Sequence, residues 1–187
     1  MDTDRYQGNL AILPIQRDSQ SGAISSFTVA LSSISVADGS GTSQFSQTNL
    51  AIPVILDSGT TLTYLPDAIA NSILNGVGAI SSATYGYVVP CSLANSPATF
   101  SFGFGGSNGP TINVGLNQFV TPIVSRSGRS PTFDDGSPAC SFGLQPAGQN
   151  PNLFGDTFLR SAYVVYDLEN NQIGIAQVRY TLYDTKI

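Results

Sequence analysis

Short runs in which apolar and polar residues alternate occur along most of the chain, and such alternation is typical of half-buried β-strands. In FTVALSSISV, for example, Phe27, Val29 and Leu31 point to one side, while small or hydroxylated residues point to the other. The later segment YVVYDLENNQIGIAQV predicts two strands joined by a turn at 168–171. Further strands are predicted at 8–15, 54–56, 87–89, 99–104, 111–114, 119–124, 140–144 and 153–155.

Helical spacing is clear in one segment, PDAIANSILNGVG, where apolar residues recur at helical intervals. Pro66 suits a first helical position, Asp67 suits the positive end of the helix dipole, and Gly76 or Gly78 would end the helix. The sequence predicts short helices at about 66–76 and 155–161. The expected architecture is therefore all-β with two short helices, in a single domain over residues 1–187. Segments 37–49 and 125–138 are expected to be long surface loops.

The chain is poor in charge, and this narrows its range of partners. Only 10% of its 187 residues are charged, the net charge is −5, and the seven basic residues are scattered. Phosphate binding needs clustered Lys and Arg, so nucleic acid is not expected as a partner. No apolar run approaches the roughly 20 residues that span a bilayer, so no membrane span is expected. Nothing at the start of the chain resembles a signal peptide.

Histidine is absent, which limits the chemistry that the chain can perform. Ser-His-Asp and Cys-His catalysis are excluded, and so is the commonest zinc ligand, so acid–base chemistry would fall to carboxylates. Cys91 and Cys140 are not in a Cys-x-x-Cys spacing, which argues against a metal site. They form either a disulfide or two reduced core thiols, and the low-charge, Ser/Thr-rich composition favours the disulfide of an extracellular protein.

One aspartate directly follows an apolar run. In VILDSGTTLTYL, residues 54–56 lead into Asp57 and a cluster of hydroxyls. Three consecutive large apolar residues predict a strand buried on both faces, and a carboxylate at its end needs hydrogen bonds to replace lost hydration. Gly59 lets the chain turn back, so that amides and the hydroxyls of Ser58 and Thr60 can reach the carboxylate. Because Asp-Ser-Gly is also common in turns, the tripeptide alone is weak evidence of function.

The run VILDSGTTLTYLP resembles the second active-site motif of pepsin-like aspartic proteases, an apolar segment followed by Asp-Thr/Ser-Gly-Thr/Ser. The resemblance continues in the family's order. YQGNLAILPI and FTVALSSISV resemble the first strands of the C-terminal lobe, and YVVPCSL with ACSFGLQ resembles its disulfide-bearing region. NLFGDTFLRSAYVVYDLENNQIGIAQV resembles the block that ends the lobe. The chain is identified as such a C-terminal lobe, and TTLTYLP leans toward fungal secreted or cell-surface members.

The resemblance implies a role for each residue that matches the family's pattern. Asp57 would be one of two catalytic aspartates, and Thr60 would donate to its outer carboxylate oxygen. The residues implied in substrate binding are Gly59, Thr60 and Thr61. Those implied in support of the active site are Ser58, Leu153, Phe154 and Gly155, where only glycine would let two backbones approach closely. Cys91 and Cys140 match the lobe's disulfide. Asp156 is expected to cap the following helix.

The family's mechanism needs two carboxylates that share a water, and this chain carries one such motif. The N-terminal lobe is therefore expected to be absent, and the isolated lobe to be inactive. Three explanations stay open: a lobe expressed by itself with Met1 as an added start, one chain of a processed enzyme, or two copies that pair their Asp57 loops. A non-catalytic binding or inhibitor module on this scaffold is the alternative function.

The resemblance implies an aspartic endopeptidase that hydrolyses peptide bonds, with a peptide or protein as substrate and the N-terminal lobe as partner. It implies no metal and no organic cofactor. It also implies a secreted, cell-surface or vacuolar location. The side-chain preference is not predicted, because half of each substrate pocket would belong to the other lobe. The face toward that lobe is expected to be apolar and exposed.

Overall fold

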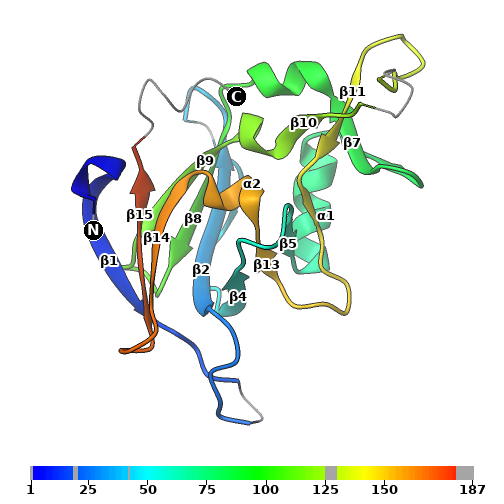
Figure 1. Ribbon diagram of the computed structural model, residues 1–187. Coiled ribbons are helices and arrows are strands. Elements are labelled where there is room, and N and C mark those ends of the chain that lie inside the picture. The colour runs from blue at the N-terminus through cyan, green and yellow to red at the C-terminus, as the bar shows by residue number, and fades with distance from the viewer. Residues whose placement is uncertain (1, 19–20, 42, 125–129, 180–187) are drawn as a thin grey trace.

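The computed structural model describes residues 2–18, 21–41, 43–124 and 130–179. Met1 and the 125–129 part of one predicted loop lie outside the described residues. Within the described ranges the chain is mostly β-strand, arranged in three sheets with two short α-helices (Figure 1). The all-β prediction with two short helices is therefore confirmed.

The first and last strands lie side by side in a small antiparallel sheet (Figure 1). Its order is β1 (Tyr6–Pro14), β15 (Gln172–Val178), β14 (Ala162–Asp167). The turn between β14 and β15 is fixed by the Asp167 carboxylate, whose Oδ1 accepts the Asn170 amide at 3.1 Å. This confirms the hairpin predicted from the terminal segment.

The central sheet carries the apolar strand that leads to Asp57. Its order is β12 (Leu144–Pro146), β5 (Thr63–Leu65), β13 (Leu153–Phe154), β4 (Ile52–Leu56), β2 (Thr28–Ala37), β8 (Thr99–Phe104), β9 (Thr111–Gly115), and β3 (Ser43–Gln47) also pairs with β2. The β13 strand pairs in parallel with β4 and antiparallel with β5, so it lies between the two strands that flank the Asp57 turn.

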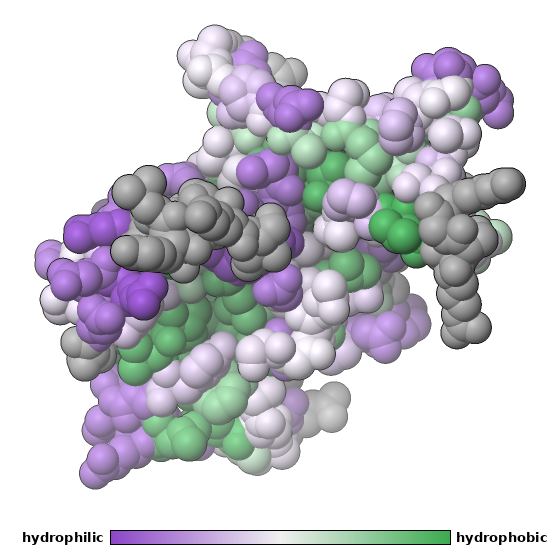
Figure 2. Space-filling view, turned by 45° about the horizontal axis from the view of Figure 1, so that its top comes forward, coloured by the Kyte–Doolittle hydropathy of each residue, from purple (hydrophilic) through white to green (hydrophobic). Residues whose placement is uncertain are grey.

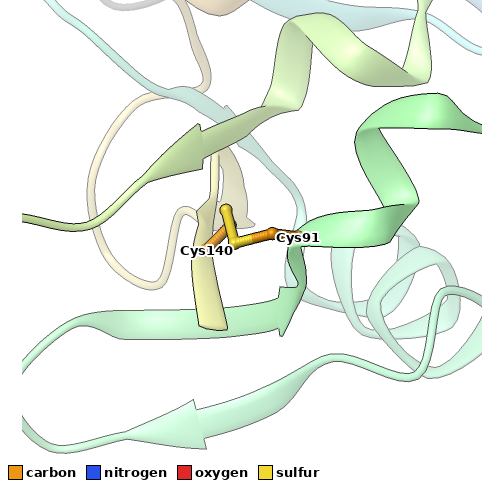
Figure 3. Close-up of a disulfide and its surroundings, with 2 residues drawn as sticks. All are labelled: Cys91 and Cys140. Atoms are coloured by element: carbon orange, nitrogen blue, oxygen red, sulfur yellow. A yellow bond between two sulfur atoms is a disulfide. The ribbon is translucent and has the colours of Figure 1, made fainter. Parts of the chain in front are cut away.

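A third sheet and the helices complete the molecule. The sheet order is β10 (Val120–Pro122), β11 (Ala139–Phe142), β7 (Gly86–Pro90), β6 (Ile80–Ser82). The helices are α1 (Asp67–Gly76), α2 (Asp156–Leu159) and the 3-10 turns η1 (Thr3–Arg5), η2 (Cys91–Asn95) and η3 (Leu116–Phe119). A disulfide joins Cys91, at the start of η2, to Cys140 in β11, with 5.0 Å between the Cα atoms (Figure 3).

Aromatic rings fill the core beneath the central sheet. The β8 strand buries Phe100, Phe102 and Phe104 at alternate positions. The Phe102 ring lies 5.2 Å from Phe154 and 5.4 Å from Phe158, and both contacts are edge-to-face. Phe154 therefore anchors β13, the strand beside the Asp57 turn, in the aromatic core.

The β2 strand changes phase along its length. Val29 and Leu31 are fully buried in its first half, whereas Ile34 and Val36 are buried in its second half. The buried positions switch from odd to even because the pairing with β8 is irregular between Leu31 and Ser33. The alternation of FTVAL is thus confirmed, and the bulge explains why it does not continue through SSISV.

Several predicted boundaries are wrong. Segment 37–49 is not a loop, since it contains β3, whose backbone pairs with β2. The predicted strand 140–144 divides into β11 and β12 at Gly143, whose amide leaves the ladder to donate to the Phe119 carbonyl at 2.7 Å. Strand 119–124 shortens to β10 because η3 occupies its start. Pro66 is the N-cap of α1 rather than its first residue.

Candidate active site

Asp57 lies directly after β4, in the turn that leads to β5. Its amide donates to the Phe154 carbonyl at 3.1 Å, which extends the parallel pairing of β4 and β13 by one residue. On the other side of the strand, the Leu56 amide donates to the Phe27 carbonyl at 3.1 Å. The backbone that carries the carboxylate is therefore held from both sides by the central sheet.

Two donors hold the Asp57 carboxylate. Thr60 Oγ1 donates to Oδ2 at 2.5 Å, and the Gly59 amide donates to Oδ1 at 2.9 Å. The Thr60 hydroxyl and then the Gly59 amide lower the pKa of Asp57, because both stabilise the charged carboxylate, while burial acts in the opposite direction. Ser58, expected to be a further hydroxyl donor, is exposed, and so is Thr61.

The turn after Asp57 packs against the segment that follows β13. Three successive amides, those of residues 155–157, donate to carbonyls of residues 60–62 at 2.8 to 3.2 Å. A Cβ atom on Gly155 would collide with the carbonyl oxygens of both Thr60 and Leu62. The crossing of the two backbones therefore requires glycine, and a larger residue would force the Asp57 turn to move.

Buried hydroxyls connect this crossing to the rest of the sheet. Thr63 Oγ1 and Thr157 Oγ1 lie 2.9 Å apart and are fully buried. Thr157 Oγ1 donates to the Gly143 carbonyl at 3.2 Å, so Thr63 is the donor to Thr157. The Gly143 carbonyl also accepts the Thr63 amide at 2.8 Å. This network joins β5, α2 and the corner between β11 and β12.

Tyr166 reaches the same turn from β14. Its hydroxyl donates to the carbonyl of Leu56, the residue before Asp57, at 3.4 Å, and its ring packs on Phe27 with 4.4 Å between centroids. Burial raises the pKa of Tyr166, and the negative charge of Asp57 raises it further. The hydroxyl is therefore a neutral hydrogen-bond donor beside the carboxylate.

Asp156 does not cap α2, so that prediction is wrong. The N-cap is Gly155, which the crossing holds in an extended conformation, and the helix starts one residue earlier than the cap prediction requires. Asp156 is the first helical residue. Its Oδ2 forms an ion pair with Arg160 Nε at 3.2 Å. A carboxylate in the first turn still complements the helix dipole.

The two faces of β4 differ in burial. Val54 and Leu56 are in the core, with 0% and 1% of their surface exposed, whereas Ile55 is half-buried. The prediction that this strand is buried on both faces is therefore wrong for the Ile55 face, which the described part of the chain covers only partly. Asp57 follows Ile55 by two residues, so the carboxylate belongs to the partly covered face.

A cavity of about 550 Å³ lies along this face. Pro53 and Ile55 line it from β4, and Thr28 lines it from β2. Asn152, just before β13, and Arg17, after β1, also line it. Pro53 and Ile55 alternate with the buried Val54 and Leu56, so the cavity lies on the partly covered face of β4, the strand that ends at the Asp57 turn.

The family model of eukaryotic aspartyl proteases matches residues 1–178, a range that contains the Asp57 turn and the segments packed against it. The chain belongs to the eukaryotic aspartyl protease family. Its Asp-Ser-Gly-Thr turn, held from below by Leu153, Phe154 and Gly155, is thus found in a family whose chemistry depends on carboxylates.

Fungal relatives of this aspartyl protease chain cover it almost completely. It is 40% identical over 189 residues to "Probable aspartic-type endopeptidase OPSB" of Arthroderma benhamiae, across 100% of this chain and 37% of that protein. It is 39% identical over 184 residues to "Acid protease" of Saccharomycopsis fibuligera, across 96% of this chain and 42% of that protein. "Secreted aspartic protease 3" of Candida albicans is 32% identical over 187 residues, across 97% of this chain and 40% of that protein.

The chain therefore spans about two fifths of the length of these relatives. Among its described residues, no three His, Cys, Asp or Glu side chains gather as metal ligands would. The described helices also include none that is long and apolar enough to cross a membrane.

Some residues around the Asp57 turn were not identified from the sequence. Thr63 and Thr157 lie 94 positions apart, so their contact has no local signal. The one available sign is that each hydroxyl stands among apolar residues, in LTYL and DTFL. Tyr166 alternates with the valines of YVVYD, which marks a strand, but its contact with the Leu56 carbonyl depends on how β14 packs on β4.

Proposed function

We propose that this chain is the C-terminal lobe of an aspartic endopeptidase and supplies one of the two catalytic carboxylates, Asp57. The observation that carries the proposal is the geometry of this carboxylate. Two donors, Thr60 Oγ1 and the Gly59 amide, orient its oxygens on a partly covered face of β4 beside a cavity. A carboxylate that served only to stabilise a turn would need neither the Gly155 crossing below it nor an open face in front of it.

In the proposed reaction, the ionised carboxylate accepts a proton from a water that attacks the scissile carbonyl, and a second, protonated carboxylate donates to the carbonyl oxygen. The lowered pKa of Asp57 suits it to the ionised state before a partner is present. Two carboxylates about 3 Å apart share one proton, so the pair would work at acidic pH. Ser58 would brace the second loop, while Gly59 and Thr61 would contact the substrate backbone.

The second carboxylate would come from an N-terminal lobe that docks on the β1, β15 and β14 sheet. Ile12, Gly174 and Val165 stand in register across one face of this sheet. Ile12 is 55% exposed, Val165 is half-buried and Gly174 is buried. Figure 2 shows hydrophobic surface between polar areas on the side of the molecule where this sheet lies. An exposed apolar face of this kind suits a large partner surface.

We also infer that the protein works outside the cytosol, at the cell surface, in the medium or in the vacuole. The Cys91–Cys140 disulfide suits an oxidising compartment. One relative is named as a secreted protease, which supports this location.

The test is cleavage of a quenched peptide library at about pH 3 to 6, with and without pepstatin. The chain alone and the chain joined to its N-terminal lobe would be assayed, each as wild type, as Asp57→Asn and as Asp134→Asn. Asp134 is an exposed loop carboxylate and serves as the matched control. We expect pepstatin-sensitive cleavage only with both lobes, its loss in Asp57→Asn, and full activity in Asp134→Asn.

The other outcomes separate the remaining explanations. Cleavage by the chain alone that follows the amount of dimer would contradict the proposal and favour two copies that pair their Asp57 loops. A two-lobed protein that never cleaves but still binds pepstatin or peptides would favour a binding module on this scaffold.

A further inference from the structure

Most of the residues that line the cavity on the β4 face are polar, and one of them is a cation. Ser26 Oγ and Thr28 Oγ1 lie 2.8 Å apart at its wall. Gln16 also lines the cavity, and so does Asn152, whose amide nitrogen already donates to the Pro53 carbonyl at 3.1 Å. Arg17 is exposed at its margin. Apolar atoms still form the larger part of the cavity surface, and Ile55 and the prolines are its apolar residues. Hydroxyls, amides and a guanidinium are donors that suit a ligand with acceptor oxygens.

Of the two charged groups at the cavity, Arg17 is the better placed to bind a ligand. Its Nη1 donates to the Gly22 carbonyl at 3.1 Å, which fixes the side chain and leaves most of its five N–H donors for other acceptors. The neighbouring Asp18 carboxylate is turned toward its own loop, where Oδ1 accepts from the Ser21 amide at 2.7 Å and the Ser21 hydroxyl at 2.8 Å.

The position of the cavity relates it to a bound peptide. An extended peptide advances about 3.3 Å per residue and alternates its side chains, like the strand beside it. If its scissile bond lies at Asp57, a side chain one or two residues along would therefore lie over Ile55, about 7 Å away on the same face. A volume of about 550 Å³ accepts one long side chain together with water.

We propose that this cavity selects, close to the scissile bond, a substrate side chain that ends in a carboxylate or carboxamide, and that Arg17 determines this selection. The inference rests on the proposed function and adds a substrate preference to it. Glutamate and glutamine have the length to reach from the β4 face to the guanidinium, whereas a lysine side chain would meet a like charge. Leucine would leave the cavity's donors without acceptors.

The test uses the two-lobed enzyme and several series of peptides. Within each series the peptides are identical except at one position near the scissile bond, which carries Glu, Gln, Leu or Lys, and the series differ in which position is varied. At one of these positions we expect kcat/KM for Glu and Gln to exceed that for Leu and Lys by about five- to tenfold. Arg17→Gln should remove most of the advantage of the Glu peptide over the Leu peptide. Arg179→Gln is the matched control, since Arg179 lies beyond the opposite end of β15.

A second variant, outside the Arg17 loop, distinguishes a loss of ligand donors from a structural change in that loop. Thr28→Val keeps the side-chain shape of a β2 residue and removes one hydroxyl from the wall, so it should lower cleavage of both the Glu and Gln peptides. A preference for Leu or Lys at every position would overturn the inference but not the proposed function. The same holds for a Glu preference that both Arg17→Gln and Thr28→Val leave intact. Failure to cleave any peptide would contradict the proposed function and, with it, the inference.

Discussion

Thr60 and Gly59 lie in the same turn as Asp57, and their hydrogen bonds stabilise the charged form of its carboxylate. Their hydrogen bonds hold the pKa of this carboxyl below the value of an unfolded aspartate, about 3.9. Folding therefore favours the charged form. This contribution to stability is fully present above the unfolded pKa and is lost as pH falls through the lower, folded pKa. The turn is thus weakest in strong acid, below the pH range in which an aspartic protease would work.

Replacing the Thr60 hydroxyl tests this directly. Thr60→Val keeps the side-chain shape and removes the larger cause of the shift, so the pKa of Asp57 should rise toward its ordinary value in the chain alone. NMR titration of the carboxyl carbon measures the change. Urea unfolding should show the variant less stable than wild type at neutral pH, with the difference vanishing in strong acid. Thr61→Val, at an exposed position, is the control, and an unmoved pKa in Thr60→Val would contradict the account.

Around Asp57, the sequence predicted the carboxylate itself but only some of the residues that contact its turn. The Asp-Ser-Gly-Thr motif led to Asp57 and to the Thr60 contact, because donors three residues away are fixed by the local turn. Ser58 was expected to donate as well, yet it faces solvent. The Thr63–Thr157 pair and Tyr166 come from distant segments, so only the packed structure brings them to the turn.

Among the elements, the crossing of the Asp57 turn and the start of α2 is the most constrained. Gly155→Ala should destabilise the chain by about 3 kcal/mol, because its new methyl group meets the Thr60 and Leu62 carbonyls. Gly76→Ala, at the end of α1, adds the same methyl group where nothing lies within 4 Å, and should change stability by less than about 1 kcal/mol. Urea denaturation compares the two, and equal effects would mean that the crossing can relax.

The disulfide fastens η2 to the third sheet across a sequence separation of 49 residues. Closing a loop of this length restricts the unfolded chain by about 4 kcal/mol. The double variant Cys91→Ala with Cys140→Ala should lose about this much unfolding free energy, and wild type in reductant should lose a similar amount. A loss below about 1 kcal/mol in denaturant unfolding would show that the bridge adds little beyond the packing of Cys140.

Strands with clear alternation were predicted from the sequence, as were the apolar runs of β4 and β13, but several short or polar strands were missed. β8 was predicted with its observed bounds because Phe100, Phe102 and Phe104 alternate with small residues. β3 was assigned to a loop, since SQFSQ has one apolar residue, and its backbone pairs with β2. β5 and β6 have three residues each, too few to show a period.

For the whole molecule, the exposed face of the β1, β15 and β14 sheet should govern association of the isolated chain. Ile12→Lys places a charge in the middle of this face and should reduce self-association measured by sedimentation velocity, with little change in stability. Ile80→Lys, on β6, is a closely matched control, because Ile80 is 56% exposed and Ile12 is 55% exposed. Equal effects of the two variants would show that association depends on net charge rather than on this face.

The pairing of β1 with β15 also determines how the molecule would respond to force. Tyr6 pairs with Val178, and the Arg179 amide donates to the Arg5 carbonyl at 2.8 Å, so the two ends of the described sheet leave from one corner. Tension applied through both ends would load these antiparallel pairs one after another instead of all at once. The sheet that is proposed to receive the other lobe would therefore unzip at low force, and a docked partner would be its main mechanical reinforcement.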